Sequence, residues 1–330
     1  MRLVCANHSS YPRVGEGRQA QRVRRAYAQR ETGKIDDAGY LEVVRDYVAE
    51  IVAEQSEAGV EVVTDGQVGW YDLVSHLAYP LDGIEIGGLL RFSDTNYLVR
   101  TPEIIGEVSG TIGLADDFRY LASVTSGTPK AVVTGPYTMA RYSLIRSNGS
   151  DIASLAMQYA EVLGAEVAAL ADAGATIVQV EEPSLVAHPG DADLVRRALE
   201  TVTKGKGSAR ISLVTYFGDA APLYGELLKM PADILGFDLT YSPGLADLLV
   251  RETPDRPVAI GAIDGRNTKL DDVTQTARTV DRIAEALAAK GVDEVHLQPS
   301  CGLEYLPRDR ALRKLERMRQ IADACEKVGT

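Results

Sequence analysis

The sequence predicts one α/β domain spanning residues 1–330, folded as a TIM-type (βα)8 barrel with a hairpin excursion after its second strand. Eight short apolar segments alternate with helical segments along the whole chain. The apolar segments are continuous rather than alternating in polarity, as expected of parallel strands buried on both faces. No shift in composition marks a domain boundary, and barrels of more than about 250 residues commonly form one domain. An open doubly wound sheet is the alternative, but no G-x-G-x-x-G motif follows an early strand.

The predicted strands are short runs rich in Val, Ile and Ala, such as AVVTG and TIVQV. Their length and composition suit the interior of a parallel sheet. The strands are predicted at residues 3–7, 61–65, 131–135, 176–182, 211–217, 234–240, 258–264 and 294–299.

Helices are predicted between these strands. Apolar residues recur at helical spacing over residues 41–52, and Gly59 is placed to end that helix. Two further helices are predicted at 151–173 and 271–290, each followed by glycine. The last helix is predicted to have Pro307 in its first turn, where the missing N–H costs little.

Residues 84–110 depart from this alternation. Two β-rich runs, at 89–92 and 97–100, are separated by the turn-forming residues Ser-Asp-Thr-Asn. This pattern predicts a hairpin that projects over the barrel.

Composition limits the classes of partner. The net charge of −12 argues against nucleic acid and against an anionic membrane surface as partners. The absence of a long apolar run or an apolar leader predicts a cytoplasmic protein that does not span a membrane. Cys5, Cys301 and Cys325 are too few and too scattered for a disulfide framework.

In a (βα)8 barrel, the binding site lies at the carboxyl ends of the strands. In this sequence all of these ends carry polar residues, and several carry carboxylates. Close carboxylates raise one another's pKa, so some are expected to be protonated or to pair with a cationic group of a substrate. Any one of them could equally be a helix N-cap or a salt bridge at the rim, but a ring of them favours a binding site.

The order of motifs along the chain resembles the catalytic barrel of cobalamin-independent methionine synthase. SSYPR at 9–13, TDGQVGWYDLV at 64–74 and VTGPYTM at 133–139 resemble the family segments G-S-[FY]-P, G-E-x-x-R-x-D-M-V and T-G-P-x-T. VQVEEPSL at 178–185 and QPSCGL at 298–303 are the most specific matches, to Q-[IV]-D-E-P-[AS]-L and N-P-[DS]-C-G-L. The resemblance covers essentially the whole chain and implies the short, single-barrel form of the family.

The resemblance implies methyl transfer to a thiol, which a His, a Cys, a Glu and a second Cys hold as a thiolate on zinc. Zinc lowers the pKa of a thiol without redox chemistry. At the four matching positions this sequence has Val214, Tyr216, Asp238 and Cys301, of which only the last two can bind zinc. His8 could complete a three-ligand site, but the sequence predicts that the usual zinc site is largely lost.

Recognition of the acceptor also differs from the pattern that the resemblance implies. Two family carboxylates that pair with an amino group are matched by Gln67 and Glu181, and Gln67 supplies no negative charge. The long enzymes of this family have a general acid near the donor, and the resemblance matches it to Arg266 here. Arginine is a poor acid but a good anion binder. Ordinary homocysteine methylation is therefore not the activity that the sequence favours.

We predict a methyltransferase that moves a methyl group from a methyl-tetrahydrofolate or methyl-corrinoid donor to a small acceptor, without the usual zinc–thiolate activation. The acceptor would be an amine, an activated carbon, or an already acidic thiol or oxygen. The alternatives are a zinc-dependent homocysteine S-methyltransferase with altered ligands, or a lyase or decarboxylase reaction on the same barrel. A subunit that exchanges methyl groups with a corrinoid or other partner protein is a further alternative, and the sequence is compatible with a homodimer.

Roles for individual residues follow from the strand ends. Glu181 or Glu182 is predicted to act as general base or cation clamp, with Tyr216 as hydrogen-bond donor or acid. The predicted catalytic set is Glu181, Glu182, Tyr216, Asp238, Asp264 and Cys301, with Asp238 and Cys301 also forming the incomplete metal site. The predicted substrate-binding residues are His8, Ser10, Gln67, Asp72, Thr134 and Gln298, and the predicted donor-binding residues are Arg266, Asn267 and Ser300.

Overall fold

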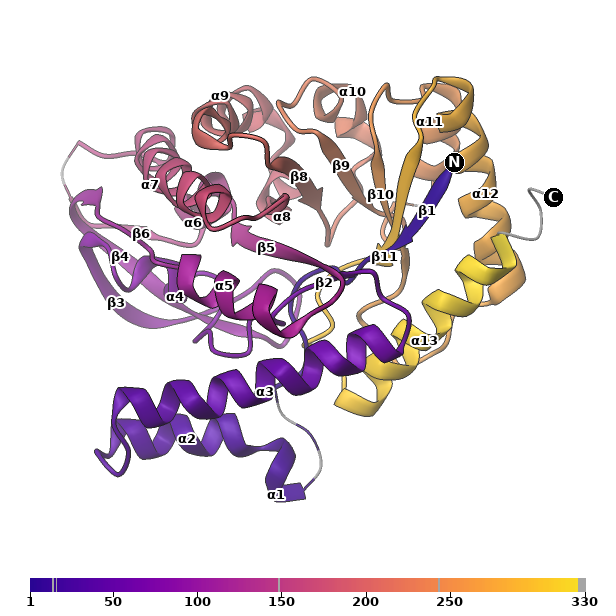
Figure 1. The fold of residues 1–330 in the computed structure, drawn as a ribbon. Coiled ribbons are helices and arrows are strands. Elements are labelled where there is room, and N and C mark those ends of the chain that lie inside the picture. Colours follow the sequence, from indigo (N-terminus) through magenta and orange to yellow (C-terminus); the bar gives the residue numbers. More distant parts are fainter. Residues whose placement is uncertain (14, 16, 148, 243, 326–330) are drawn as a thin grey trace.

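The computed structural model describes residues 1–13, 15, 17–147, 149–242 and 244–325. Within these residues, eight parallel strands form the barrel in the order β1-β11-β10-β9-β8-β7-β5-β2 (Figure 1). A bridge between Ala6 and Val62 joins β1 to β2 and closes the ring. The strands are β1 (Arg2–Cys5), β2 (Val62–Val63), β5 (Thr128–Thr134), β7 (Ile177–Glu181), β8 (Arg210–Thr215), β9 (Ile234–Asp238), β10 (Val258–Ile263) and β11 (Glu294–Pro299).

The barrel predicted from the sequence is confirmed, and each predicted strand has its counterpart. Most observed strands are a residue or two shorter at their carboxyl ends, because the chain turns there into the loops of the site. The strand β2 is the extreme case, with two residues in place of the predicted five at 61–65. The seam between β1 and β2 is consequently the shortest contact between neighbouring strands.

Helices surround the barrel and cap its loops. The longest are α3 (Asp37–Glu57), α7 (Ile152–Asp172), α12 (Val273–Ala289) and α13 (Arg308–Cys325), all at the predicted places. The others are α1 (Gly17–Ala20), α2 (Arg22–Glu31), α4 (Ser75–Ala78), α5 (Ala115–Val124), α6 (Pro136–Arg141), α8 (Pro183–Ala187), α9 (Ala192–Val202), α10 (Tyr224–Leu227) and α11 (Leu245–Arg251), with 3-10 turns η1 (Pro189–Asp191), η2 (Thr203–Gly205) and η3 (Ala221–Leu223).

Side-chain caps explain where the long helices begin. Asp36, Asp151 and Asp272 precede α3, α7 and α12, and each carboxylate accepts a hydrogen bond from a backbone N–H in the first turn. Gly59 follows α3 with a φ of 85°, a conformation that costs glycine little. Pro307 lies just before α13 rather than inside its first turn, and its carbonyl accepts from Ala311 N.

The helix α2 was not predicted. Its sequence, RVRRAYAQRE, is mostly polar, and only Val23 and Ala26 are buried. It packs along α3, and the two form an arm that extends from the barrel beneath the β3–β4 hairpin (Figure 1).

The predicted hairpin excursion is confirmed but is longer than expected. The strands β3 (Asp82–Arg91) and β4 (Leu98–Ser109) pair antiparallel, and β6 (Leu144–Ile145) adds to β4 in a second sheet of the described chain. Phe92 at the hairpin tip is buried against Tyr142, with ring centroids 4.8 Å apart. The tip is therefore held to the barrel.

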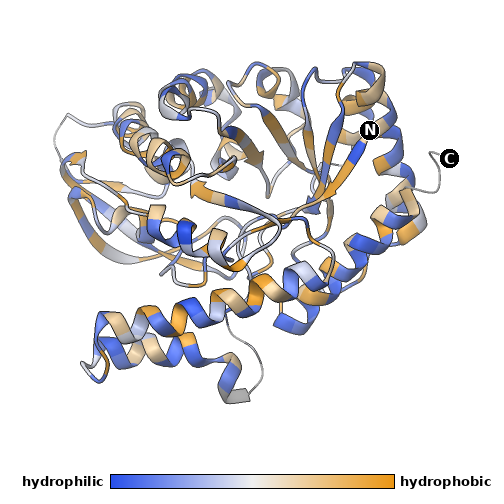
Figure 2. Ribbon diagram, in the orientation of Figure 1, coloured by the Kyte–Doolittle hydropathy of each residue, from blue (hydrophilic) through white to orange (hydrophobic). Residues whose placement is uncertain are grey.

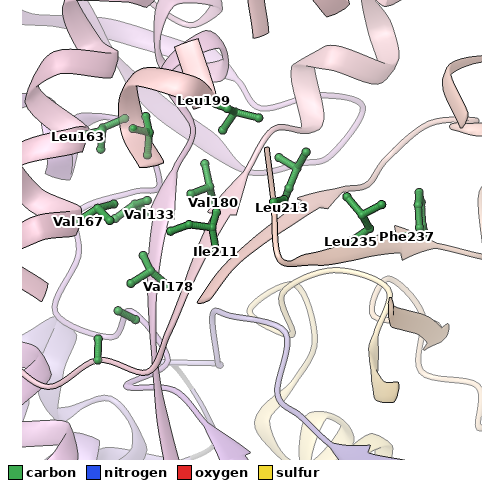
Figure 3. Packing of buried hydrophobic residues seen from close by; sticks show 14 of the residues in the cluster. Val133, Leu163, Val167, Val178, Val180, Leu199, Ile211, Leu213, Leu235 and Phe237 are labelled. Carbon is green, nitrogen blue, oxygen red and sulfur yellow. The ribbon is translucent and has the colours of Figure 1, made fainter. Parts of the chain in front are cut away.

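Side chains on the strands alternate between the helices outside and the barrel interior. Val178 and Val180 of β7 pack in the outer cluster with Leu163 of α7 (Figure 3). Figure 2 shows the barrel strands largely in hydrophobic colours, whereas the helices mix hydrophobic and hydrophilic residues. The neighbouring Ile177 belongs instead to a small cluster inside the barrel. Gln179 and Glu181 follow Ile177 at two-residue steps, so they face the same interior.

Candidate active site

Glu181 is the central carboxylate of the barrel mouth. It ends β7, and its relative exposure is 1%. Its Oε2 accepts a hydrogen bond from Tyr216 Oη at 2.8 Å, and its Oε1 accepts one from Gln179 Nε2 at 2.8 Å and lies 3.4 Å from His8 Nδ1. Burial raises the pKa of Glu181, but hydrogen bonds and charge from His8, with help from Tyr216, outweigh it and leave the pKa below its ordinary value. Glu181 is therefore an anion held by donors on several strands.

A buried polar chain supports Glu181 from below. Lys130 Nζ donates to Gln179 Oε1 and to the carbonyl of Asn7, both at 2.6 Å. Gln179 Nε2 also donates to the carbonyl of His8 at 2.9 Å. Burial lowers the pKa of Lys130 to about 7. These contacts fix the orientation of the Gln179 amide, so that its N–H faces Glu181.

Tyr216 occupies one of the positions that the resemblance assigns to a zinc ligand. Its ring edge packs on His8 with centroids 5.2 Å apart. Burial raises the pKa of Tyr216 well above its ordinary value, and the negative charge of Glu181 adds to this. The hydroxyl therefore stays protonated and donates to Glu181.

Asp238 and Cys301 are engaged within the protein. Asp238 Oδ1 accepts from Thr240 N at 2.8 Å and from Thr240 Oγ1 at 2.6 Å, while Oδ2 accepts from Phe217 N at 3.3 Å. Burial raises the pKa of Asp238 to about 6. The Cys301 thiol donates to the carbonyl of Gly302 at 3.4 Å, and burial with the neighbouring Asp238 charge raises its pKa well above the ordinary value.

The residues present do not fit a zinc site. Val214 and Tyr216 stand at two of the four positions that the resemblance assigns to zinc ligands, and neither side chain is a usual zinc ligand. Among the described residues, no group of three or more His, Cys, Asp or Glu side chains is arranged to hold a metal ion. His8 is turned to Ser9, whose Oγ lies 2.9 Å from His8 Nδ1, and to Glu181, rather than toward a ligand trio with Asp238 and Cys301.

Several buried polar atoms at the strand ends lack a hydrogen-bond partner within the described chain. A buried polar atom without a partner costs about 1–3 kcal/mol, so a cluster of them marks a place where a ligand would bind. The atoms are Asn7 Oδ1, His8 Nε2, both amide atoms of Gln67, Thr215 Oγ1 and Gln298 Nε2. Gln67 also has a φ of 53°, which is uncommon outside glycine and is compatible with a functional constraint.

Three predicted site residues make hydrogen bonds to the backbone of neighbouring segments. The Glu182 carboxylate accepts from Tyr137 N at 2.9 Å and Thr138 N at 2.8 Å, at the start of α6. Asp72 Oδ1 accepts from Ser75 N at 2.6 Å, and Oδ2 accepts from Arg100 N of β4 at 3.0 Å. Thr134 Oγ1 donates to the carbonyl of Leu73. These groups hold the loops around the mouth, and their polar atoms are already used.

Ser10 lies beside the loop that follows β11. Its carbonyl accepts from Leu303 N at 2.9 Å, and a Cβ added at Gly302 would lie 2.0 Å from Ser10 Oγ. The absence of a side chain at Gly302 therefore lets this loop close over the end of β1.

Of the predicted donor-binding residues, Arg266 reaches the hairpin tip, whereas Asn267 and Ser300 bond within the loops after β10 and β11. Asp264 Oδ1 accepts from Arg266 N at 2.8 Å, and its Oδ2 accepts from Asn267 Nδ2. Ser300 Oγ accepts from Gly265 N at 3.2 Å. The Arg266 guanidinium lies 4.9 Å from the ring centroid of Phe217 and pairs with Asp94 at 2.9 Å. Arg266 thus joins the β10 loop to the hairpin tip.

A cavity of about 350 Å³ opens between the tip and the barrel. It is lined by Asp94, Thr95, Asn96, Tyr97, Arg266, Glu304 and Tyr305. Glu304 Oε1 is buried without a partner in the described residues, and burial raises the pKa of this carboxyl to about 7 against the opposing charge of Arg13.

Sequence reasoning missed Glu304 and Lys130. Glu304 directly follows the QPSCGL motif, so its place in the loop after the last strand could have marked it as a site residue. Lys130 precedes the predicted strand 131–135 and carried no signal, because its burial depends on a strand that begins earlier, at Thr128.

No helix in the described residues is long and apolar enough to cross a membrane.

Comparison with known proteins agrees with this arrangement. The profile of the family described as cobalamin-independent synthase, catalytic domain, matches residues 9–324. The chain is 29% identical over 314 residues to a methionine synthase of Sulfurisphaera tokodaii, covering 94% of this chain and 88% of the relative. It is 28% identical over 318 residues to a methionine synthase of Saccharolobus solfataricus, covering 94% of this chain and 90% of the relative.

Solved structures share the fold. A B12-independent methionine synthase from Shewanella sp. W3-18-1, in complex with selenomethionine, superposes with a TM-score of 0.81 at 19% identity, covering 99% of this chain and 98% of that one. A methyltransferase from Methanosarcina mazei superposes with a TM-score of 0.63 at 13% identity, covering 99% and 94%. With the family profile spanning nearly the whole barrel, the chain belongs to the cobalamin-independent methionine synthase catalytic-domain family, a family of methyltransferases.

Proposed function

We propose that this chain transfers a methyl group from methyl-tetrahydrofolate to a small acceptor held beside Glu181, without zinc–thiolate activation. The observation that supports this most directly is the 2.8 Å hydrogen bond from Tyr216 Oη to Glu181 Oε2. Tyr216, at a position that the resemblance assigns to a zinc ligand, therefore donates a hydrogen bond to a carboxylate. The unpartnered atoms of His8, Gln67 and Thr215 leave hydrogen-bonding capacity for an acceptor at the same end of the barrel.

The charge of Glu181 decides its part in the reaction. A carboxylate with a lowered pKa is a weak base, and it binds a cationic or strongly polarised group better than it removes a proton. We therefore assign Glu181 the role of orienting the acceptor, with Tyr216 keeping the carboxylate in place. Of the two roles considered for Glu181, the geometry favours the cation clamp.

Proton balance requires a second group. The nucleophilic atom of the acceptor bonds to the methyl carbon as the bond from that carbon to the donor nitrogen breaks. The acceptor releases its proton to water, the donor nitrogen gains a proton, and the group that supplies this proton is reprotonated from water. Glu304, with a pKa of about 7, can hold a proton near neutral pH and lines the 350 Å³ cavity. We assign Glu304 the delivery of a proton to the leaving nitrogen.

The donor would bind under the hairpin tip. Arg266 supplies a cation on the wall of this cavity, Asn96 supplies an amide, and Tyr97 and Tyr305 supply aromatic rings. The family description is that of a cobalamin-independent enzyme, which supports a folate donor over a corrinoid.

A methyl-transfer assay with metal analysis tests this proposal. Purified, untagged protein is incubated with methyl-labelled methyl-tetrahydrofolate and a panel of amine, thiol and activated-carbon acceptors, with and without a chelator. We expect label transfer that survives chelation in the wild type and in the matched variant Cys301→Ala. Zinc near one equivalent per chain that falls in Cys301→Ala, with transfer lost on chelation, would contradict the metal-independent mechanism. Transfer to no acceptor would contradict the proposed activity.

A further inference from the structure

A second cleft lies between the α2–α3 arm and the barrel, and Glu181 is not among its lining residues. Its volume is about 330 Å³. We call it the arginine cleft and define it by Arg24, Tyr27, Tyr40, Trp70, Tyr71 and Arg100, which line it. Arg24 and Tyr27 come from α2, Tyr40 from α3, and Arg100 from β4. The cleft therefore exists only because the arm folds back beside the hairpin.

Two of its cations are unpaired. The guanidinium groups of Arg24 and Arg100 make no hydrogen bond or ion pair with any described residue, although ion pairs are common elsewhere on this protein. A third arginine at the cleft, Arg13, is already committed, since it donates to the carbonyls of Trp70 and Tyr71. Arg24 and Arg100 are thus the groups free to bind an anion.

The remaining walls are aromatic. Tyr27 makes an edge contact with Tyr71 at 5.5 Å and with Tyr40 at 6.3 Å between ring centroids. Trp70 is 5% exposed, and its Nε1 is buried without a hydrogen-bond partner in the described chain. The Trp70 ring stacks on His76, whose Nδ1 likewise has no partner there. Aromatic rings on several sides of the cleft suit a flat ligand.

Arginine is concentrated on one helix of the cleft, α2. The protein has a formal net charge of −12, yet α2 carries four arginines against one glutamate. Of the α2 arginines, Arg24 lines the cleft and with Arg100 offers it two guanidinium groups that suit a small anion. The overall charge and the size of the cleft argue against nucleic acid as the occupant.

We propose that the arginine cleft binds a small molecule in which an aromatic ring carries carboxylate groups. Arg24 and Arg100 would pair with the carboxylates, and Tyr27, Tyr71 and Trp70 would contact the ring. The carboxylate-bearing end of a folate and a separate aromatic carboxylate effector share this chemistry. Binding is measured without turnover, so the proposal stands or falls independently of methyl transfer.

Trp70 provides the readout, because it is the only tryptophan in the sequence. The full-length protein, labelled with 15N-tryptophan, is titrated with 4-aminobenzoyl-glutamate while the single indole N–H resonance is followed. We expect a saturable shift, and affinity measured by calorimetry should weaken on addition of salt. Arg24→Gln and Arg100→Gln should each weaken binding by roughly tenfold, as expected for loss of a charge-assisted contact.

Arg25→Gln is the matched control. Arg25 is a neighbouring, exposed arginine of α2 that does not line the cleft, so its loss changes net charge equally but should leave affinity unchanged. Competition with tetrahydrofolate identifies the source: mutual exclusion assigns the site to the donor, and simultaneous binding assigns it to a separate effector.

Three results would overturn the proposal. They are an indole resonance that does not respond, equal weakening by Arg25→Gln, or a change of oligomeric state in Arg24→Gln and Arg100→Gln as measured by light scattering. The last result would show that the two arginines bind a second copy of the chain rather than a small molecule.

Discussion

At the scale of single residues, Tyr216 and Glu181 form the pair on which the proposed activity depends. Tyr216→Phe removes the donor to Glu181 Oε2 while keeping the ring beside His8. A hydrogen bond to a charged group contributes about 1.5–3 kcal/mol, so the variant should lose roughly tenfold or more in kcat/KM. The tyrosine also lowers the pKa of Glu181, so the acid limb of the pH–rate profile should move to higher pH.

The pH–rate profiles of the wild type and of Tyr216→Phe check this prediction. Tyr224→Phe serves as the control, since Tyr224 donates to the carbonyl of Glu252 away from the mouth. An unchanged acid limb in Tyr216→Phe would show that this hydroxyl does not set the state of Glu181.

Glu304 gives a prediction for the alkaline limb of the pH–rate profile. Burial raises its pKa to about 7, and the protonated form is the one we assign to the reaction. Activity should therefore fall as pH rises through about 7, and Glu304→Gln, which cannot deliver a proton, should be slow and lack this alkaline limb. If Glu304→Gln keeps both full rate and the limb, another group supplies the proton.

The sequence predicted individual site residues only where they lie at the carboxyl end of a predicted strand. Glu181, Tyr216 and Gln298 lie at the mouth as predicted from the sequence, because each lies at or next to the carboxyl end of a buried strand. The sequence alone did not separate the roles of Glu181 and Glu182. In the structure, side chains alternate along the strand, so Glu181 points into the barrel and Glu182 accepts hydrogen bonds from the start of α6. Lys130 and Glu304 depend on burial, which a sequence does not show.

At the scale of elements, Glu182 fixes the start of α6 to the end of β7. A Cβ added at Gly135 would lie 2.3 Å from Glu182 Cδ, so the contact is close. Burial raises the pKa of Glu182 to about 7, and a carboxyl with a raised pKa stabilises the fold at low pH and loses that contribution as pH rises through about 7. Glu182→Gln should lower the free energy of unfolding at pH 5 and flatten its fall between pH about 5 and about 7.

Urea unfolding at several pH values measures this change. Glu200→Gln, on the exposed side of α9, is the control and should follow the wild-type curve. A Glu182→Gln protein with the wild-type pH dependence would show that Glu182 does not titrate in this range.

The hairpin tip provides a second prediction for an element. Arg266 pairs with Asp94, whose side chain is 60% exposed, so Asp94→Asn should change stability little. It should loosen the tip over the 350 Å³ cavity and raise KM for the donor more than it changes kcat. Amide hydrogen exchange at residues 93–97 should also become faster. Faster exchange with an unchanged KM for the donor would show that the hairpin tip does not contribute to donor binding.

The elements that the sequence missed share a cause. The barrel strands were predicted because burial on both faces makes their apolar runs continuous. The helix α2 buries only Val23 and Ala26, so its periodicity is too weak to detect. The hairpin was predicted too short because β3 leaves much of its length exposed and its polarity does not alternate.

At the scale of the whole molecule, Lys130 connects three strands across the barrel. Its ammonium donates to the carbonyl of Asn7 beyond β1 and to Gln179 on β7, close to the short β1–β2 seam. Lys130→Met leaves both acceptors unpaired and should lower the free energy of unfolding by about 1–3 kcal/mol at neutral pH. A lysine whose pKa is lowered to about 7 stabilises the fold at high pH and loses that contribution as pH falls through about 7.

Chemical denaturation from pH about 7 to about 9 tests this prediction. The wild type should gain stability relative to Lys130→Met as pH rises, and Lys206→Met, at the surface, should behave as the wild type. A constant difference between wild type and Lys130→Met across this range would show that Lys130 is charged in the folded protein.

The apolar cluster inside the barrel is formed by Val4, Ala6, Val62, Ile177, Ile234 and Ala259, whereas the polar groups stand at the strands' carboxyl ends. Packing inside the barrel uses the first set and the proposed chemistry uses the second, and the two sets have no residue in common. Mutations at the mouth can therefore accumulate without unfolding the protein. Under the metal-independent function proposed above, a lineage could pass through folded forms that bind no metal and have not yet gained a new acceptor, and Val214 and Tyr216 would be the residues left by such a history.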